Sequence, residues 1–516
     1  MLLVHPPVAK PCEPPAGIAR LAGLLRQHDI PHRLFDANIE VLHYMLGLPP
    51  APDSADDAWS SRAFRHRQGH IAALRDIATY RNPDRYRRSV KDLGRVLAKV
   101  SPDRVILGLA NFDDRELSPH RSGDLLRAAE CPELNPFYDL FRSRLSELFR
   151  QATPSAVGVS LNYLSQALCA FSIIGILRRE YPGVRRILGG GLVTSWMSNP
   201  GWKNPFSGLL DHLVSGPGEK QLLALLGSTA GDEGLPRPHY FGLPGERYLS
   251  PGFVLPYSAS SGCPWKRCAF CPEEAEANPY VAVPVKQVLA DLEQLIEETS
   301  PSLIHLLDNA VSPALLEALA AHPPGAAWYG FARVGEHLTD PGFCRELKRA
   351  GCVMLKLGIE SGDQDVLDAL NKGIRVDTAS RALRNIKDAG IAAYVYLLFG
   401  TPPETESSAR KTLEFAAQHS DCIDYLNLAI FNMPLCGAAS SGLHRVGFSE
   451  GDLSLYTDFL HPARWHRRRI RLFLEREFKT HPALSEVIRR ESPVFTSNHA
   501  PFFVMERRAF PQSKQW

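Results

Sequence analysis

The 516-residue sequence lacks an excess of charge of either sign. Lysine and arginine total 58, aspartate and glutamate total 56, and the formal net charge is +2. Proteins that bind nucleic acid or anionic membranes mainly through charge carry a clear positive excess, because phosphate contacts dominate that binding. The overall charge therefore gives this chain no general attraction to either partner, and we expect it to bind neither.

The N-terminus, MLLVHPPVAK, lacks the basic flank and long apolar stretch of a secretory signal. We therefore expect a cytoplasmic protein whose cysteines stay reduced. A charge-free segment at 152–177 is long enough to resemble a membrane span, which needs roughly 20 apolar residues. It contains Ser160, Asn162 and Ser165 and divides into a buried strand and a helix, so we expect no span.

The chain also lacks short internal repeats and low-complexity tracts. Its length allows about two to four domains. A segment rich in glycine and proline at 231–252 indicates a domain boundary. We predict a first domain at 1–235 with a helical insertion at about 42–152, a barrel at 250–445, and a small, mostly helical C-terminal extension at 446–516.

In the first domain, short β-rich runs alternate with helical patterns. The runs lie at 2–7, 32–37, 156–161, 185–191 and 211–219. This alternation predicts a doubly wound parallel sheet of the Rossmann-like kind. The insertion is rich in Arg, Asp and Pro, and its run DRVILGLA, at 103–110, is a possible further strand.

A second alternating series follows. Its strands are predicted at 253–260, 303–308, 326–333, 353–360, 392–400 and 425–432. Six strands separated by helical stretches indicate a complete or partial β/α barrel. The C-terminal run HPARWHRRRIRLFLEREFK is typical of a helix with a solvated basic face, and binding of an anionic substrate or a carrier is the alternative.

Three of the ten cysteines lie within nine residues, in SSGCPWKRCAFCPE: Cys263, Cys268 and Cys271. They fall between the first barrel strand and the first barrel helix, and such barrels place their chemistry on loops at the carboxyl ends of strands. A structural zinc site normally needs four ligands, and the other seven cysteines form no second close pair. An odd number of thiols disfavours a disulfide. A four-iron cluster held by three thiolates accounts for the number and leaves one iron open.

At these residues the sequence resembles the radical S-adenosylmethionine (SAM) enzymes. Their usual signature is Cys-x3-Cys-x2-Cys with an aromatic residue before the last cysteine. Here the spacing is Cys-x4-Cys-x2-Cys with Phe270, and it resembles a variant, GC-x-W-x-x-C-x-F-C, of subfamilies with an N-terminal cobalamin-type domain. The resemblance implies a [4Fe-4S] cluster on the three cysteines, SAM bound at the open iron, and reductive cleavage to a 5′-deoxyadenosyl radical. An electron donor such as flavodoxin or ferredoxin is implied with it.

The resemblance extends to the ends of later strands. KLGIESGDQDVLDALNKG and YLLFGTPPET are similar to the fourth- and fifth-strand segments of the family, whereas the Gly-Gly-Glu often found after the second strand is absent from LLDNAVSP. SAM contacts are implied for Phe270, Asp308, Asn309, Arg333, Glu360, Ser361 and Gly400. For Asp308 and Arg333 alone, a helix cap or a loop charge is the alternative.

The first domain resembles the cobalamin-binding domains that precede many radical SAM enzymes. A parallel sheet binds a large cofactor outside the carboxyl ends of its strands, where glycine-containing loops allow close approach. The resemblance implies cobalamin contacts at Pro15, Asn38, Ser160, Asn162, Tyr163, Gly189, Gly190, Gly191, Thr194, Gly216 and Glu219. The Asp-x-His-x-x-Gly segment that supplies a histidine to cobalt in other cobalamin proteins is missing, so a structural domain without cobalamin is the alternative.

These features indicate a radical SAM enzyme, and among its activities a cobalamin-dependent methyltransferase acting on an unactivated carbon or a phosphorus centre. A radical SAM rearrangement, cyclisation or cleavage without methyl transfer is the enzymatic alternative. An iron-sulfur regulator that binds nucleic acid is a third hypothesis, which the near-neutral charge disfavours. The sequence predicts a small-molecule or peptide substrate and does not identify it.

Overall fold

A computed structural model describes residues 1–50, 57–199, 201–228, 235–436, 442–446 and 450–509. It divides the chain into two compact units, Met1–Phe253 with Ser449–Leu455, and Val254–Phe448 with Tyr456–Trp516. The predicted boundary segment 231–252 falls within the first unit, and its residues 231–234 lie outside the described residues. Most of the predicted C-terminal extension groups with the barrel rather than by itself.

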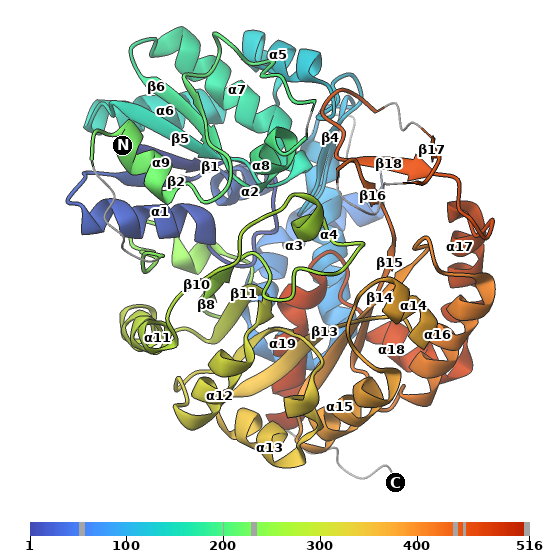
Figure 1. The fold of residues 1–516 in the computed structure, drawn as a ribbon. Coiled ribbons are helices and arrows are strands. Elements are labelled where there is room, and N and C mark those ends of the chain that lie inside the picture. The colour runs from blue at the N-terminus through green and yellow to red at the C-terminus, as the bar shows by residue number, and fades with distance from the viewer. Residues whose placement is uncertain (51–56, 200, 229–234, 437–441, 447–449, 510–516) are drawn as a thin grey trace. The chain divides into compact units, whose positions relative to one another are not determined.

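The first unit contains a five-stranded parallel sheet in the order β2-β1-β5-β6-β7. Its strands are β1 (Leu2–His5), β2 (Arg33–Asp36), β5 (Ala156–Ser160), β6 (Arg185–Gly189) and β7 (His212–Leu213). Its helices are α1 (Ala16–Gln27), α7 (Leu164–Glu180), α8 (Gly191–Met197) and α9 (Glu219–Leu225). Figure 1 shows α1 and α7 on opposite faces of the sheet. The predicted doubly wound parallel sheet is confirmed.

The strand order of this sheet reverses between β1 and β5. The chain runs from β1 outward to β2 and then returns to place β5 on the other side of β1. In open α/β sheets this switch point leaves a crevice at the carboxyl ends of the strands, where ligands bind. Apolar side chains beneath it, including Leu3, Ile18 and Ile187, form a core between the sheet and α1.

The segment between β2 and β5 is mostly helical, as predicted. Its elements are α2 (Ala37–Gly47), α3 (Ala58–Arg75), η1 (Ile77–Arg81), α4 (Pro83–Val100), β3 (Val105–Leu107), β4 (Phe112–Asp114), α5 (Ser122–Glu130), η2 (Pro132–Leu134) and α6 (Tyr138–Gln151). The possible strand at 103–110 is present as β3, which pairs with β4 in a small antiparallel hairpin.

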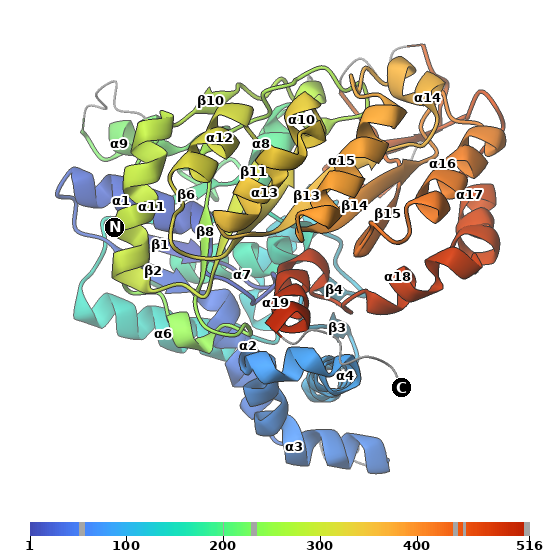
Figure 2. The same ribbon diagram turned by 90° about the horizontal axis from the view of Figure 1, so that it is seen from below.

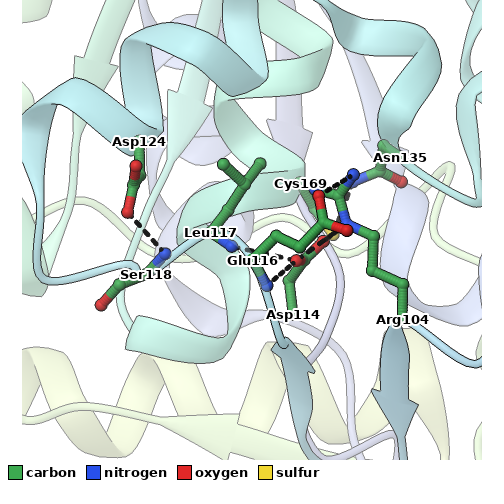
Figure 3. A network of polar contacts seen from close by, with 8 residues as sticks. All are labelled: Arg104, Asp114, Glu116, Leu117, Ser118, Asp124, Asn135 and Cys169. Carbon is green, nitrogen blue, oxygen red and sulfur yellow. Dashed lines mark hydrogen bonds and ion pairs between the residues drawn. The ribbon is translucent and has the colours of Figure 1, made fainter.

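A polar network holds the β3–β4 hairpin (Figure 3). Arg104 Nε donates to both carboxylate oxygens of Asp114 at 2.9 Å. Asp114 Oδ1 also accepts the backbone N–H groups of Glu116 and Leu117, which shapes the turn after β4. Since a buried or half-buried carboxylate needs such partners, the hairpin is fixed by charge as well as by its short ladder.

The second unit is built on six parallel strands in the order β15-β14-β13-β12-β11-β8. The strands are β8 (Val254–Tyr257), β11 (Leu303–Val311), β12 (Trp328–Ala332), β13 (Cys352–Glu360), β14 (Ala392–Phe399) and β15 (Tyr425–Ile430). Their helices are α11 (Val285–Thr299), α12 (Pro313–Ala321), α13 (Pro341–Arg349), α14 (Gln364–Ala369), α15 (Val376–Asp388) and α16 (Glu406–Gln418). Figure 2 shows α11, α12, α13, α15 and α16 following one another along one side of the curved sheet. This is the predicted partial barrel.

The rest of the second unit consists of short elements. They are β9 (Ser260–Ser261), α10 (Pro272–Ala275), β10 (Val281–Ala282), η4 (Glu336–Thr339), β16 (Met433–Pro434), β17 (Arg445–Val446), β18 (Tyr456–Phe459), α17 (Arg467–Phe473), the π-helical turn η6 (Leu474–Phe478), η7 (Pro482–Leu484), α18 (Ser485–Arg490) and α19 (Thr496–Ala509). The predicted basic helix begins at Arg467. The small sheet of β16, β17 and β18 was not predicted, because strands of two to four residues leave no periodic pattern.

A buried carboxyl links the turn after β14 to the C-terminal segment. Glu404 is fully buried, and its Oε2 accepts hydrogen bonds from the backbone N–H of Gly400 and from Trp465 Nε1, the latter at 2.9 Å. His461 Nε2 lies 2.9 Å from the carbonyl oxygen of Thr401 in the same turn. The C-terminal segment is therefore tied to the carboxyl end of β14.

Among the helices of the described residues, including the apolar α7, none has the length and hydropathy needed to cross a bilayer.

We expect Glu404 to make stability depend on pH. Burial raises the pKa of Glu404 from 4.5 to about 7, against the hydrogen bonds from Gly400 and Trp465 that lower it. The folded state then binds the proton more tightly than the unfolded state, so this contribution is greatest below pH 4.5 and is lost as the pH rises through 7. The free energy of unfolding of the wild type, minus that of Glu404→Gln, should fall across this range by about 3 kcal/mol.

Urea unfolding of both proteins at about pH 5 and about pH 8 measures this difference. Glu406→Gln is the matched control, because Glu406 is exposed on the same stretch of chain and pairs with Arg410 at the surface. The same pH dependence in wild type and Glu404→Gln would contradict the prediction.

Candidate functional site

The three clustered cysteines lie on one loop at the carboxyl end of β8. The loop leaves β9 at Ser261 and ends where α10 begins at Pro272. Cys263, Cys268 and Cys271 are free thiols of intermediate exposure, so they are neither paired in a disulfide nor buried in apolar packing. They are therefore accessible to a ligand that enters from the loop side.

The thiols influence one another and need compensating charge. The pKa of Cys271 is raised to about 11, mainly by burial and also by Cys268 and Cys263, against the backbone N–H groups of Glu273 and Glu274, which lower it. Burial also raises the pKa of Cys268, against Lys372 and Arg333, whose positive charges lower it. Ionising Cys268 and Cys271 is therefore unfavourable by itself, and a bound metal centre would supply the missing positive charge.

The three thiols fit a cluster held by three cysteines. A cuboidal cluster binds each thiolate at a different iron. Within the described residues, no group of three or more His, Cys, Asp or Glu side chains has the arrangement of a site for a single metal ion.

Asp308 and Asn309, at the end of β11, hold the strand that leads into the cysteine loop. Asp308 is buried, and its carboxylate accepts hydrogen bonds from the backbone N–H of Ala259 and from Ser260 Oγ. Asn309 Nδ2 donates to the carbonyl oxygen of Gly262 at 3.2 Å. The structure brings both residues to the site and gives them these backbone contacts, so their contact with SAM stays a prediction.

Arg333 follows β12 and lies against the cysteine loop. Its guanidinium stacks 3.8 Å from the ring centroid of Trp265, and Nη2 donates to the carbonyl oxygens of Lys372 and Gly373. These backbone carbonyls hold the guanidinium beside the loop, and the contact of Arg333 with SAM stays a prediction. Arg333 remains close enough to Cys268 to lower the pKa of its thiol.

Glu360 ends β13 in a left-handed conformation, with φ of 69°, and its Oε1 accepts a hydrogen bond of 2.8 Å from Lys372 Nζ. Lys372 Nζ also lies 5.6 Å from the ring centroid of Phe270, between the second and third cysteines. Glu360, Phe270 and Lys372 therefore meet beside the thiols. Lys372 was missed by the sequence reasoning, although the Asn-Lys-Gly that ends the fourth-strand segment contains it.

Ser361 and Gly400 have structural partners. Ser361 is buried, and its Oγ lies 3.1 Å from Thr412 Oγ1 on α16. Gly400 has φ of 80° and donates its N–H to Glu404. The left-handed backbone turns the chain sharply at the carboxyl end of β14. Gly400 therefore lies at the predicted end of the barrel, whereas Ser361 packs between β13 and α16.

The inner face of the barrel is partly open at its carboxyl end. Phe331, Gly358 and Tyr396 are half-buried, while their neighbours on the outer face are buried beneath the helices. The rings of Phe331 and Tyr396 approach to 4.9 Å between centroids across β13, where Gly358 has no side chain. Below them, Lys356 Nζ lies 4.3 Å from the Phe331 ring centroid and 2.9 Å from His305 Nε2.

Barrel interiors usually contain branched apolar side chains, so a buried lysine and histidine here are unusual. Both were missed by the sequence reasoning. The only sequence signal is a basic residue within an otherwise apolar strand, at Lys356 in VMLKLGIE and at His305 in LIHLLD.

Most of the predicted cobalamin contacts lie together at the carboxyl edge of the first unit's sheet. Asn162 Oδ1 accepts the N–H of Gly191 at 3.0 Å, and Thr194 Oγ1 accepts the N–H of Gly216 at 2.9 Å. Ser160 ends β5 and bonds to Asn162, Gly189 ends β6, and Tyr163 exposes 57% of its surface. A glycine-rich edge with an exposed aromatic ring fits a large, flat cofactor.

Gly190 forms the turn at the centre of this edge. Its φ is 114°, and a Cβ there would lie 2.4 Å from the carbonyl oxygen of Leu161. Only glycine allows the two loops to approach this closely.

Two of the remaining predicted contacts have protein partners. Pro15 precedes α1. Asn38 is buried and bonds through both side-chain atoms to the backbone of Ala9, which fixes the loop after β1. Glu219 pairs with Arg20 Nε at 2.6 Å. Contact of these three residues with cobalamin stays a prediction.

The chain has identifiable relatives. The sequence profile of the radical SAM superfamily matches residues 257–416. An uncharacterized methyltransferase of Pyrococcus horikoshii is 24% identical over 331 residues, which cover 57% of this chain and 70% of that protein. The anaerobic magnesium-protoporphyrin IX monomethyl ester cyclase of Rubrivivax gelatinosus is 26% identical over 163 residues, covering 30% of this chain and 29% of the cyclase.

Among solved structures, the radical SAM methyltransferase TsrM of Kitasatospora setae, with tryptophan and a SAM analogue bound, aligns with a TM-score of 0.52 at 15% identity. The alignment covers 84% of this chain and 73% of that protein. TsrM has also been solved with cobalamin and a [4Fe-4S] cluster bound. Since identity is low, this likeness establishes the fold.

The matched segment begins at the end of β8, includes the cysteine loop and all four strands from β11 to β14, and ends within α16. Residues 257–416 therefore form a radical SAM domain, and the chain shares its fold with a solved radical SAM methyltransferase.

Proposed function

We propose that this chain is a cobalamin-dependent radical SAM methyltransferase. The observation that carries the proposal is the combination, in one chain, of the three-thiol loop on a partial barrel and a parallel sheet with a glycine-rich carboxyl edge. The fold likeness to TsrM extends over 84% of the chain and so includes most of both units. The relative from Pyrococcus horikoshii, which bears the name methyltransferase, supports the same assignment.

Cys263, Cys268 and Cys271 would hold the [4Fe-4S] cluster, and the carboxyl edge around Gly190 would hold cobalamin. When bound, the cluster supplies the electron that cleaves SAM, and cobalamin carries the methyl group. Lys372 and Arg333 lower the pKa of the Cys268 thiol and so favour its ligand form. Glu360 holds the Lys372 ammonium in place at 2.8 Å.

The substrate would enter the barrel at its open carboxyl end. Phe331 and Tyr396 offer aromatic walls, and the Lys356–His305 pair forms a polar floor at a depth where water is excluded. A small molecule with an apolar or aromatic body and a polar group fits this lining, because pockets with apolar walls use a few polar groups to orient a ligand. A carrier protein such as flavodoxin or ferredoxin would deliver the electron.

None of the ten cysteines, all within the described residues, forms a disulfide, which fits a reducing compartment such as the cytoplasm.

A second candidate function is radical SAM chemistry without methyl transfer. The relative from Rubrivivax gelatinosus bears the name cyclase, and its match covers 30% of this chain. In that case the first unit would be structural, and its glycine-rich edge would have no cofactor.

We expect Cys268→Ala to abolish the brown iron-sulfur absorption of anaerobically reconstituted protein while the far-ultraviolet circular dichroism stays unchanged. The thiol is half-exposed on a loop, so its loss removes a ligand and little packing. Iron per chain and the visible spectrum measure the result. Cys131→Ala, another thiol of intermediate exposure, is the control and should keep the full iron content. Full iron in Cys268→Ala would refute the ligand assignment.

We expect the reduced, anaerobic enzyme to form both 5′-deoxyadenosine and S-adenosylhomocysteine from SAM when its substrate is present. Methyl transfer to cobalamin releases S-adenosylhomocysteine, whereas radical chemistry alone releases 5′-deoxyadenosine. Chromatography of the quenched reaction, with and without added cobalamin, separates the two products. Formation of 5′-deoxyadenosine alone, unaffected by cobalamin, would favour the second candidate.

We expect Tyr163→Ala to lower the cobalamin bound per chain at least about threefold, because an exposed ring at the carboxyl edge can pack against a flat cofactor. The change removes an exposed side chain and should leave the melting temperature unchanged. Tyr44→Ala is the control, since Tyr44 is also exposed in this unit but lies on α2. The visible absorption of cobalamin after gel filtration measures the amount retained. Equal retention in the two variants would contradict the contact between Tyr163 and cobalamin.

A further inference from the structure

The turn that follows α14 accepts hydrogen bonds from the cysteine loop. Four consecutive residues, Leu370, Asn371, Lys372 and Gly373, each direct a backbone carbonyl oxygen at the loop or at Arg333. The N–H of Ala269 donates to Leu370 at 3.0 Å, and Trp265 Nε1 donates to Asn371 at 2.9 Å. Arg333 Nη2 donates to Lys372 and, at 3.0 Å, to Gly373.

The turn has backbone carbonyl groups available as hydrogen-bond acceptors because it lies at the end of a helix. Carbonyl groups in the last turn of a helix and just beyond it have no donor within the helix and need partners from elsewhere. α14 ends at Ala369, and the chain turns through a left-handed Asn371, with φ of 51°, before Gly373. The cysteine loop supplies two of the missing donors, so the loop and the helix end stabilise one another.

Trp265 and Gly373 fit together closely. Gly373 has φ of 63°, and a Cβ on it would lie 2.2 Å from Trp265 Cζ2 and 2.6 Å from Cη2. Neither indole atom is free to move away, because the ring is held by its bond to Asn371 and by Arg333, which stacks on it at 3.8 Å. Only glycine at position 373 leaves room for the indole.

The backbone beside the anchored indole is left-handed. Lys266, directly after Trp265, has a φ of 44°. Ala269, further along the loop, is bound to the same turn. The cysteine loop is therefore attached to the turn at two places, Trp265 and Ala269.

We propose that the turn 370–373 is the positioning element of the cysteine loop, with Trp265 as its anchor and Gly373 as the residue that admits the anchor. Cys263 and Cys268 lie on either side of Trp265 in the sequence, so fixing the indole restricts both thiols before any metal arrives. Such preorganisation lowers the entropic cost of binding. The inference rests on the proposed function only in taking the three thiols as cluster ligands.

Gly373→Ala in the full-length chain tests the proposal, with Gly325→Ala as the matched control. Gly325 lies in the same unit with φ of 81° and has open space around its Cβ position, so its substitution carries the backbone strain without the clash. After anaerobic reconstitution we expect at least about threefold less iron per chain in Gly373→Ala than in Gly325→Ala. The electron paramagnetic resonance signal of the reduced cluster with SAM should broaden or disappear in the same variant.

A second-site variant separates the clash from general misfolding. Phenylalanine lacks the part of the indole that contains Cζ2 and Cη2, and it also lacks the Nε1 donor of the anchor. Trp265→Phe alone should therefore bind less iron than wild type, and adding Gly373→Ala to it should remove less iron than the same change removes from wild type. Melting temperatures and circular dichroism report on folding. Wild-type iron and resonance spectra in Gly373→Ala, or an equal loss of iron when Gly373→Ala is added to wild type and to Trp265→Phe, would overturn the proposal.

The rates at which the apoprotein thiols react with a thiol reagent provide a readout without metal. Release of the loop should make Cys263 and Cys268 react faster in Gly373→Ala than in Gly325→Ala, and equal rates would count against the anchor. Wild-type protein that binds no iron at all would instead refute the proposed function, and the comparison of thiol rates would still decide the role of the turn.

Discussion

Ionising Cys268 and Cys271 on the half-buried cysteine loop is unfavourable unless positive charge compensates them. Burial and mutual repulsion raise the pKa of Cys271 to about 11, and they oppose ionisation of Cys268 as well. Lys372 and Arg333 supply part of the compensation, and an iron cluster would supply the rest. The ion pair between Lys372 and Glu360 holds the lysine ammonium group beside the thiols.

The two units place their candidate sites by the same rule. In each, parallel strands end at a common edge, and the loops after them carry the residues that matter. In the first unit the edge is formed around Gly190 and the switch between β1 and β5. In the second it carries the cysteine loop, Arg333 and Glu360. The rule fixes where chemistry takes place and leaves the choice of chemistry to the loop residues.

Several residues expected to touch SAM also bind the protein at the ends of strands. Asp308 and Asn309 bind the backbone of 259–262, and Ser361 binds Thr412. Asp308 and Asn309 lie in the last four residues of β11, and Ser361 directly follows β13. There the backbone leaves the ladder and needs side-chain partners. These residues hold the strand ends in place, and their contact with SAM stays a prediction.

The features of the fold that were predicted from the sequence depend on residues close together in the chain. The cysteine spacing, the alternation of strands and helices, and the glycine-rich strand ends predicted the two sheets, the partial barrel and the cluster loop, because each depends on local pattern and periodicity. Only the tertiary structure revealed the fit of Trp265 against Gly373, the Lys356–His305 pair and the link from Glu404 to Trp465. These contacts join segments between about 50 and 110 residues apart, and their geometry depends on how strands and helices pack, which no local pattern encodes.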